Sequence, residues 1–130
     1  MADPMDEDDD GARWPRAAAR AADAKQAENV LVLDVGDVLA ITGHFVIASA
    51  ANTRLVRTIA EEVEASIAEA GWARPRRVEG LDDLRWVLMD YGDFVVHVFL
   101  DEARRYYELE RLWADVDRVD WRAPSLTEGA

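Results

Sequence analysis

The chain has 130 residues, half of them hydrophobic, no cysteine, and a formal net charge of −12 at pH 7. This length suits one domain with a modest core, and the absence of cysteine excludes disulfides, thiol catalysis and cysteine zinc sites. The negative charge argues against direct nucleic-acid binding and favours a basic protein partner, and a chain with no membrane-spanning run and no secretory signal pattern is expected in the cytoplasm.

Residues 1–14 carry six acidic side chains, which contribute −6 of the net charge of −12. A run this acidic is expected to be disordered, either as a solubilising tail or as an interaction tail. From Pro15 the chain is rich in Ala, Lys, Arg and Glu, which favour helix, and proline suits a first helical turn. The folded domain is therefore expected to span residues 15–118, followed by a flexible C-terminal tail over residues 119–130.

The middle of the chain predicts several strands and one long helix. Strands are expected over runs of β-branched and apolar residues: 30–35, 44–49, 74–80 (a short edge strand and loop), 85–89 and 94–99. Between the second and third of these runs lies a helix with Asn52 or Thr53 as its N-cap and an apolar stripe at helical spacing. Gly71 stands where a glycine commonly ends a helix.

The last two predicted strands form a β-hairpin around the turn sequence DYGD. If Tyr91 and Gly92 are a two-residue turn, Asp90 lies opposite Asp93. One face of the hairpin then carries Trp86, Leu88, Asp90, Asp93, Val95 and His97. The other face is almost wholly apolar and suits the core: Arg85, Val87, Met89, Phe94, Val96 and Val98. Two opposed aspartates repel each other, so either the turn is shaped for a ligand or partner, or both side chains bond local backbone N–H groups.

A last helix is predicted from Asp101, which can cap it, to about residue 115. One of its faces carries Glu102, Tyr106, Leu109 and Trp113. The leucine and the tryptophan are expected in the core. The i, i+4 spacing of Arg104 and Glu108 favours an ion pair. Tyr106 and Tyr107 point about 100° apart on a helix, so at least one lies at the surface, where tyrosine is a common interface anchor.

The order helix, strand, strand, helix, strand, strand, strand, helix predicts an α/β or α+β domain, with a mixed sheet of about five strands flanked by helices. Asp90, Asp93 and His97 are candidate metal or acid–base residues. No zinc ligand set, nucleophile elbow, dinucleotide loop or P-loop accompanies them. The residues alone favour a binding module over an enzyme; the alternatives are a nucleotide- or metal-dependent transferase that uses Asp90 and Asp93, and a homodimeric scaffold.

Two consecutive blocks, WVLMDYGDFVVHVF (86–99) and EARRYYELERLW (102–113), resemble the ribosomal silencing factor family, also called RsfS or Iojap-like. The resemblance covers roughly residues 16–116. It implies a fold related to nucleotidyltransferases without established nucleotidyltransfer, no cofactor, and homodimers in some members. It also implies binding to the large ribosomal subunit through large-subunit ribosomal protein fourteen, which would block joining of the small subunit and lower translation when nutrients are short.

Carried over by position, the resemblance implies that a partner binds at Trp86, Asp90, Gly92, Asp93, His97, Arg104, Tyr107, Leu109 and Glu110. Among these, the tryptophan and the tyrosine are expected to be apolar anchors, the acidic residues to meet basic groups, and the histidine to orient the turn. The chain departs from the family pattern at Gly43 and His44, where an aspartate and an aromatic residue are usual. It also departs at Leu55, where a histidine is usual.

Overall fold

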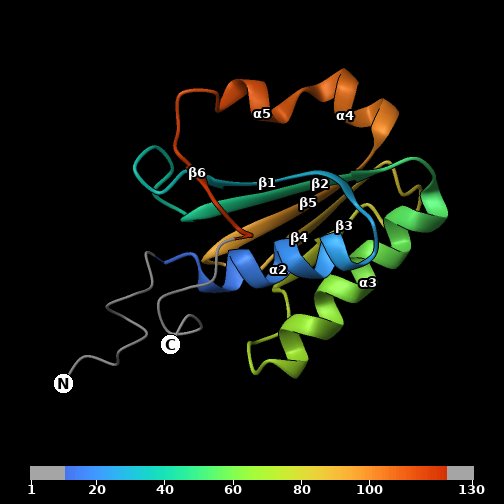
Figure 1. Cartoon of the computed structure of the whole chain (residues 1–130), viewed down its shortest axis with the longest axis horizontal. Coiled ribbons are helices and arrows are strands. Elements are labelled where there is room, and N and C mark those ends of the chain that lie inside the picture. The colour runs from blue at the N-terminus through green and yellow to red at the C-terminus, as the bar shows by residue number, and fades with distance from the viewer. Residues whose placement is uncertain (1–10, 123–130) are drawn as a thin grey trace.

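The computed structural model describes residues 11–122, which form a three-layer domain (Figure 1). In chain order the elements are α2 (Arg13–Ala24), β1 (Glu28–Asp34), β2 (His44–Ala50), α3 (Thr53–Glu69), β3 (Arg77–Glu79), β4 (Trp86–Asp90), β5 (Phe94–Leu100), α4 (Asp101–Tyr107), α5 (Leu109–Leu112) and β6 (Arg118–Val119). They build one six-stranded sheet in the order β3-β4-β5-β2-β1-β6. Strands β2 and β5 run parallel and the other neighbours antiparallel, so the predicted mixed sheet is confirmed.

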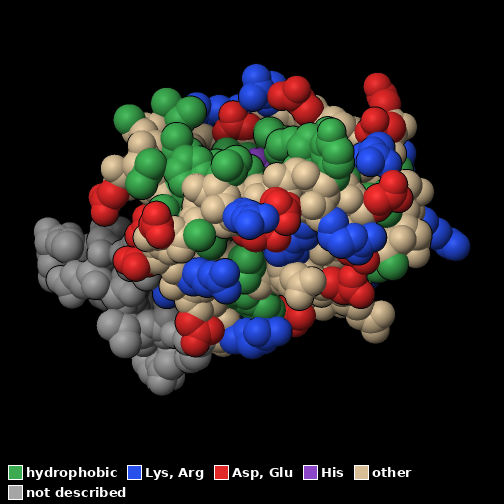
Figure 2. All heavy atoms as spheres, turned by 90° about the horizontal axis from the view of Figure 1, so that it is seen from above, with side chains coloured by type: hydrophobic (Ala, Val, Ile, Leu, Met, Phe, Trp, Pro, Cys, Tyr) green, Lys and Arg blue, Asp and Glu red, His purple; other side chains and the backbone are tan. Residues whose placement is uncertain are grey.

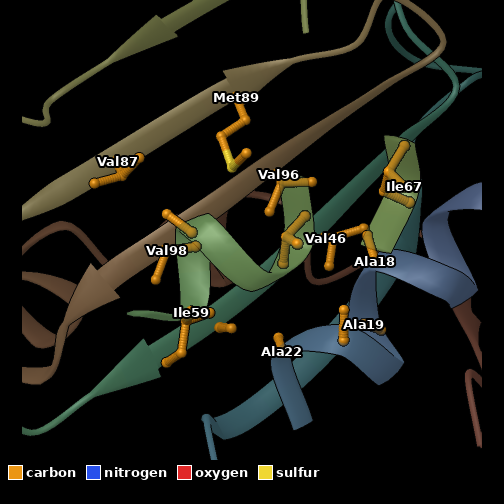
Figure 3. Close-up of a cluster of buried hydrophobic side chains, with 14 of the residues drawn as sticks. Ala18, Ala19, Ala22, Val46, Ile59, Ile67, Val87, Met89, Val96 and Val98 are labelled. Carbon is orange, nitrogen blue, oxygen red and sulfur yellow. The ribbon is translucent and has the colours of Figure 1, made fainter. Parts of the chain in front are cut away.

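Helices α2 and α3 cover one face of the sheet, and α4 and α5 lie over the opposite face (Figure 1). The first layer rests on the larger core, which Figure 3 shows: valines and Met89 of the strands meet Ile59 and Ile67 of α3 and the alanines of α2. The buried residues of α3 follow helical spacing, as predicted. Because the apolar side of α2 is mostly alanine, this helix packs closely against α3 and the sheet.

A second, smaller core lies between the sheet and the α4–α5 layer. Its buried members are Leu33, Val35, Phe45, Ile47, Phe99 and Ala103. Leu109 and Trp113 pack against them from α5 and its C-terminal end, which agrees with their predicted place in the core. Strand β2 is buried along its whole length because both layers cover it.

The ends of α3 agree with the prediction from the sequence, whereas the last helix differs from its prediction. Asn52 is the N-cap and its side chain accepts the Leu55 N–H at 2.8 Å, and Gly71 has a φ of +104°. The predicted single helix over 101–115 is wrong: Glu108 has left-handed backbone angles, which end α4 and let α5 begin at the next residue. Asp101 is the first residue of α4 and provides no side-chain cap.

The hairpin pairs two residues away from the predicted register. The Tyr91 N–H donates to the Phe94 carbonyl at 2.9 Å, so the two turn residues are Gly92 and Asp93. Asp90 therefore lies opposite Val95, and the predicted opposition of the two aspartates is wrong. A shift of two keeps every side chain on its face, because side chains alternate along a strand. The predicted faces hold for this reason, and the almost wholly apolar face forms part of the larger core.

Both ends of the domain extend beyond the predicted limits at 15 and 118. Helix α2 begins at Arg13, and β6 pairs with β1 through Val119 as a sixth strand. Trp121 is buried in the larger core, and its indole N–H donates to the Val30 carbonyl at 2.9 Å. Residues 1–10 and 123–130 of the two predicted tails lie outside the described residues. No helix within residues 11–122 has the length and hydrophobicity needed to span a membrane.

Candidate functional site

Aromatic side chains form a row from the end of α4 to the open face of the sheet. The ring of Trp86 on β4 lies 5.0 Å from the ring of Tyr107 and 4.9 Å from that of Phe99, measured between centroids. Tyr106 adds an edge-to-face contact with Tyr107 at 5.0 Å. Tyr106 and Tyr107 are 78% and 49% exposed, so the prediction of at least one surface tyrosine is confirmed. The row presents large rings that are fixed by their neighbours and still reach solvent.

His97 joins this row to the interior of the sheet. The indole N–H of Trp86 donates to His97 Nδ1 at 3.0 Å, and the Phe45 ring lies edge-on at 4.8 Å. Because indole can only donate, Nδ1 must accept, and the neutral ring carries its proton on Nε2. Burial lowers the pKa of His97 to about 4, so the ring is neutral at pH 7. Its Nε2 has no hydrogen-bond partner among residues 11–122.

A cavity of about 290 Å³, here called the hairpin groove, lies beside His97. It is lined by Leu39, Ile41, Thr42, Phe45, Arg76, Arg77, Leu88, Asp90, Gly92, Val95 and His97. Four parts of the chain form it: the loop between β1 and β2, strand β2, the start of β3, and the β4–β5 hairpin. Figure 2 looks at the α4–α5 face and shows hydrophobic side chains in two groups along its upper margin, with a histidine visible between them.

The tip of the hairpin carries charges of both signs. Asp90 accepts the Gly92 N–H through Oδ1 at 2.8 Å, which is the local backbone bond that the sequence left as one of two alternatives. Asp93 is exposed in the turn. The guanidinium of Arg76 lies so close to Gly92 that an added Cβ would come within 2.8 Å of it. The φ of +87° at Gly92 disfavours any other residue there, and a side chain would also have to push the flexible end of Arg76 aside.

Arg104 and Glu110 form an internal brace under α4 and α5. Arg104 is only 7% exposed; its Nε donates to Glu110 Oε1 at 3.1 Å, and its Nη1 donates to Ser49 Oγ at 3.0 Å and to the Glu28 carbonyl at 3.3 Å. The predicted pair of Arg104 with Glu108 is wrong, because Glu108 pairs instead with Arg111 at the surface. Residues six apart lie on different sides of a straight helix, so the break at Glu108 is what lets Glu110 reach Arg104.

The structure therefore divides the predicted partner-binding residues into three groups. These are the aromatic row with its histidine (Trp86, His97, Tyr107), the hairpin tip (Asp90, Gly92, Asp93) and the underside of α4–α5 (Arg104, Leu109, Glu110). His97 from the first group and Asp90 and Gly92 from the second line the hairpin groove, and the third group holds the helical layer in place.

Sequence reasoning missed most of the groove outside the hairpin. Arg76, Arg77 and the loop residues Leu39, Ile41 and Thr42 line it, although none of them was among the predicted partner-binding residues. Their placement depends on β3 pairing with β4, and on the β1–β2 loop returning beside the hairpin. Ile41 is 85% exposed in the structure, but a single apolar residue in a loop does not by itself indicate a contact surface, so the sequence offered no signal for this part of the groove.

The candidate metal residues are not assembled into a site. Within residues 11–122, no three His, Asp or Glu side chains are grouped so that they could hold a metal ion. Asp90 is committed to the Gly92 N–H, Asp93 faces solvent, and His97 accepts from an indole. This arrangement suits contact with a partner surface better than coordination of a cation.

Comparisons with known proteins agree on one family. The family model described as "Ribosomal silencing factor during starvation" matches residues 10–129. The chain is 40% identical over 105 residues to the ribosomal silencing factor RsfS of Bacillus subtilis, covering 81% of this chain and 88% of that protein. It is 30% identical over 91 residues to mouse "Mitochondrial assembly of ribosomal large subunit protein 1", covering 68% of this chain and 40% of that protein. A crystal structure from Bacillus halodurans matches with a TM-score of 0.70 and 37% identity, covering 82% of this chain and 95% of that one.

Proposed function

Because the chain belongs to the ribosomal silencing factor family, and so has a ribosome-associated silencing role, we propose that it represses translation by binding the large ribosomal subunit and sterically blocking the small subunit. The bacterial relatives are named as silencing factors, and the mouse relative is named for assembly of the mitochondrial large subunit. Repression would lower translation under nutrient limitation, which agrees with the starvation named in the family's description. The proposed place of action is the cytoplasm.

The proposed contact on the large subunit is large-subunit ribosomal protein fourteen. The observation that carries this proposal is the exposed row of fixed rings at Trp86 and Tyr107, next to the hairpin groove. Aromatic side chains held in place by their neighbours lose little entropy on binding and are common anchors of interfaces. The net charge of −12 favours a basic protein over bare RNA, since opposite charge speeds encounter and like charge opposes it.

Each group of predicted residues has a part in this interface. Trp86 and Tyr107 would bury their rings against the partner, and Asp90 and Asp93 at the hairpin tip would meet its basic groups. Arg104, Leu109 and Glu110 would act by holding α4 and α5 against the sheet, because they contact the interior of this chain. His97 would hold the Trp86 ring in its orientation through the bond to Nδ1.

The first test is co-sedimentation with purified large subunits, followed by addition of small subunits. Wild-type protein should remain on the large subunit and reduce joining. Trp86→Ala and Tyr107→Ala should each weaken binding by about 1–3 kcal/mol, as truncation of interface anchors commonly does. Trp72→Ala is the matched control, because Trp72 packs against Trp14 at the core on the opposite side of the sheet. The proposal fails if wild-type protein does not sediment with the large subunit.

Other outcomes would favour the alternatives. If Tyr107→Ala converts a wild-type dimer to monomers and leaves large-subunit binding unchanged, the aromatic row is a contact between two copies of this chain. We propose that the protein acts without catalysis or cofactor, in keeping with relatives named as silencing factors. Saturable binding of a nucleoside triphosphate that is lost in Asp93→Asn would contradict this and support a transferase.

A further inference from the structure

The hairpin groove contains two buried polar groups without a hydrogen-bond partner among the described residues. His97 is 4% exposed and Thr42 is 9% exposed, and both line the groove. The atoms concerned are His97 Nε2 and Thr42 Oγ1, and both are shielded from solvent, so a molecule in the groove reaches them only when the groove walls move. Buried polar groups in folded proteins are nearly always paired, so two unpaired groups in one cavity indicate a surface completed by a bound molecule.

The bond from Trp86 decides which chemistry His97 offers to that molecule. Because Nδ1 accepts the indole N–H, the ring proton lies on Nε2, which is a neutral donor. The atom that binds there must therefore be an acceptor, which excludes a metal ion or an ammonium group. Thr42 can donate or accept and does not change this requirement.

The charges around the groove argue against an anion as the occupant. Arg77 is paired with Glu79 at 2.8 Å, and the other charged lining residues, Arg76 and Asp90, have opposite signs. A phosphate or carboxylate would gain little electrostatic free energy there, because the positive and negative charges around the groove largely cancel. A main-chain carbonyl is a neutral acceptor and meets the same donor without any cost from nearby carboxylates.

The walls of the groove are mostly apolar. Leu88 and Val95 come from the hairpin, Phe45 from β2, and Leu39 and Ile41 from the loop at the mouth. A volume of about 290 Å³ is at the lower limit for small-molecule sites and accommodates one or two side chains better than a cofactor. The groove is also continuous with the aromatic row, because His97 belongs to both.

We propose that the hairpin groove receives an apolar side chain from the ribosomal protein partner, and that the groove walls move apart on binding so that a neighbouring main-chain carbonyl of that partner accepts a hydrogen bond from His97 Nε2. This inference rests on the proposed function and adds the β1–β2 loop and the start of β3 to the contact surface. It also gives His97 a direct contact with the partner, besides its role in holding Trp86.

Two substitutions at His97 separate its two hydrogen bonds. The amide oxygen of His97→Asn can replace Nδ1 as acceptor for Trp86, but this variant has no donor at the Nε2 position. The amide N–H of His97→Gln can replace the Nε2 donor and loses the Nδ1 acceptor. In titrations with purified large subunits, we expect His97→Asn to bind about 10-fold more weakly than wild type, because the partner's carbonyl is left unpaired. His97→Gln should bind more tightly than His97→Asn.

The apolar part of the groove is tested by filling it. Val95→Phe adds a ring inside the groove, whereas Val38→Phe adds the same bulk at a 62% exposed position of the β1–β2 loop that does not line it. Only the first should lose large-subunit binding, by about 10-fold or more. Ile41→Asp is the safeguard against misfolding, because Ile41 is 85% exposed and a charge there should disfavour entry of an apolar side chain.

The results also separate this inference from the proposed function. Suppose that wild type binds large subunits and the double variant Trp86→Ala/Tyr107→Ala does not. If the folded groove variants then bind like wild type, the groove inference is wrong and the proposed function stands. If the groove variants alter only self-association, a second copy is the occupant and the inference is again wrong. If wild type does not bind large subunits, both fall.

Discussion

His97 and Gly92 show how single residues of this surface depend on their surroundings. Histidine near neutral pH commonly serves as a proton carrier or metal ligand, and the sequence left both uses open. Burial keeps the His97 ring neutral and Trp86 occupies Nδ1, so one donor on Nε2 remains. Gly92 was selected by resemblance alone, and the structure gives the physical reasons, a positive φ and the close guanidinium of Arg76.

The stability of the protein should depend on pH through His97. The pKa of this group is lowered from 6.5 to about 4 on folding, so the unfolded state binds more protons between these values. Stability is therefore full above pH 6.5 and falls as the pH is lowered towards 4, by about 2 to 3 kcal/mol at pH 4.5. Urea unfolding at pH 7.5 and 4.5 should show a smaller pH effect in His97→Asn than in wild type. Equal pH effects in the two proteins would contradict the assignment.

Gly92→Ala should destabilise the hairpin tip. An alanine at a φ of +87° is strained by about 1 kcal/mol, and the added methyl must also displace the Arg76 guanidinium. Gly71→Ala is a matched comparison, because Gly71 has a φ of +104° and no atom within 4 Å of an added Cβ. The difference between the two variants in chemical denaturation reports the Arg76 contact. A Gly92→Ala protein as stable as wild type would show that the turn relaxes freely.

At the scale of elements, the break between α4 and α5 is the feature that organises the helical layer. A left-handed residue such as Glu108 is unusual for a side chain with a Cβ and is strained by about 1 kcal/mol or more. This strain is offset by new contacts, because the break brings Glu110 to the buried Arg104. The same arginine bonds to β1 and β2 and so holds the helical layer against the sheet. Tyr107 ends α4 directly before this break, so the same geometry sets its ring against Trp86.

Removal of the ion pair between Arg104 and Glu110 should lower the free energy of unfolding. Glu110→Ala leaves the buried Arg104 without its carboxylate, and we expect a loss of about 1–3 kcal/mol of stability, since an unpaired buried charge keeps its desolvation penalty. Arg111→Ala removes an exposed pair with Glu108 and should change stability by less than about 1 kcal/mol. Guanidinium denaturation compares the two. Equal effects would mean that Arg104 finds water or another acceptor when Glu110 is lost.

At the scale of the whole molecule, the net negative charge and the arrangement of helices on the sheet both bear on partner binding. Helices α2 and α3 cover one face of the sheet, and α4 and α5 lie over the other (Figure 1). Neither α4 nor α5 contributes a lining residue to the hairpin groove, so this part of the second face is open. The open part carries the aromatic row and the groove, and the molecule as a whole is strongly acidic. In the proposed function, long-range charge would bring a basic partner to the molecule, and apolar side chains on the open part would hold it.

Binding to large subunits should therefore weaken as salt is added. Raising the ionic strength from about 0.05 to about 0.3 M shortens the Debye length and should lower the association rate more than it raises the dissociation rate. Stopped-flow or surface-based kinetics with purified large subunits measure both rates. An association rate that does not change with salt would indicate that apolar contact dominates and that the acidity of the chain serves another purpose.

Much of this architecture follows from local periodicity. The apolar stripe of α3, its Asn52 cap and the two faces of the hairpin could be predicted because side-chain direction repeats every 3.6 residues in a helix and every two in a strand. The predicted faces are correct although the predicted turn is wrong, because the register differs by two residues and side chains alternate between faces at every residue. The resemblance of two blocks in the hairpin and last helix then sufficed to identify the family.

The remaining features depend on contacts between distant parts of the chain. Nothing local indicates that β6 joins the sheet beside β1, that Trp121 closes the larger core against Val30, or that Arg104 reaches Ser49 across 55 residues. The groove likewise exists only where a loop, an edge strand and a hairpin meet. Such contacts form because burial and hydrogen bonding favour them over the whole fold, and their free energy is not encoded in the spacing of neighbouring residues.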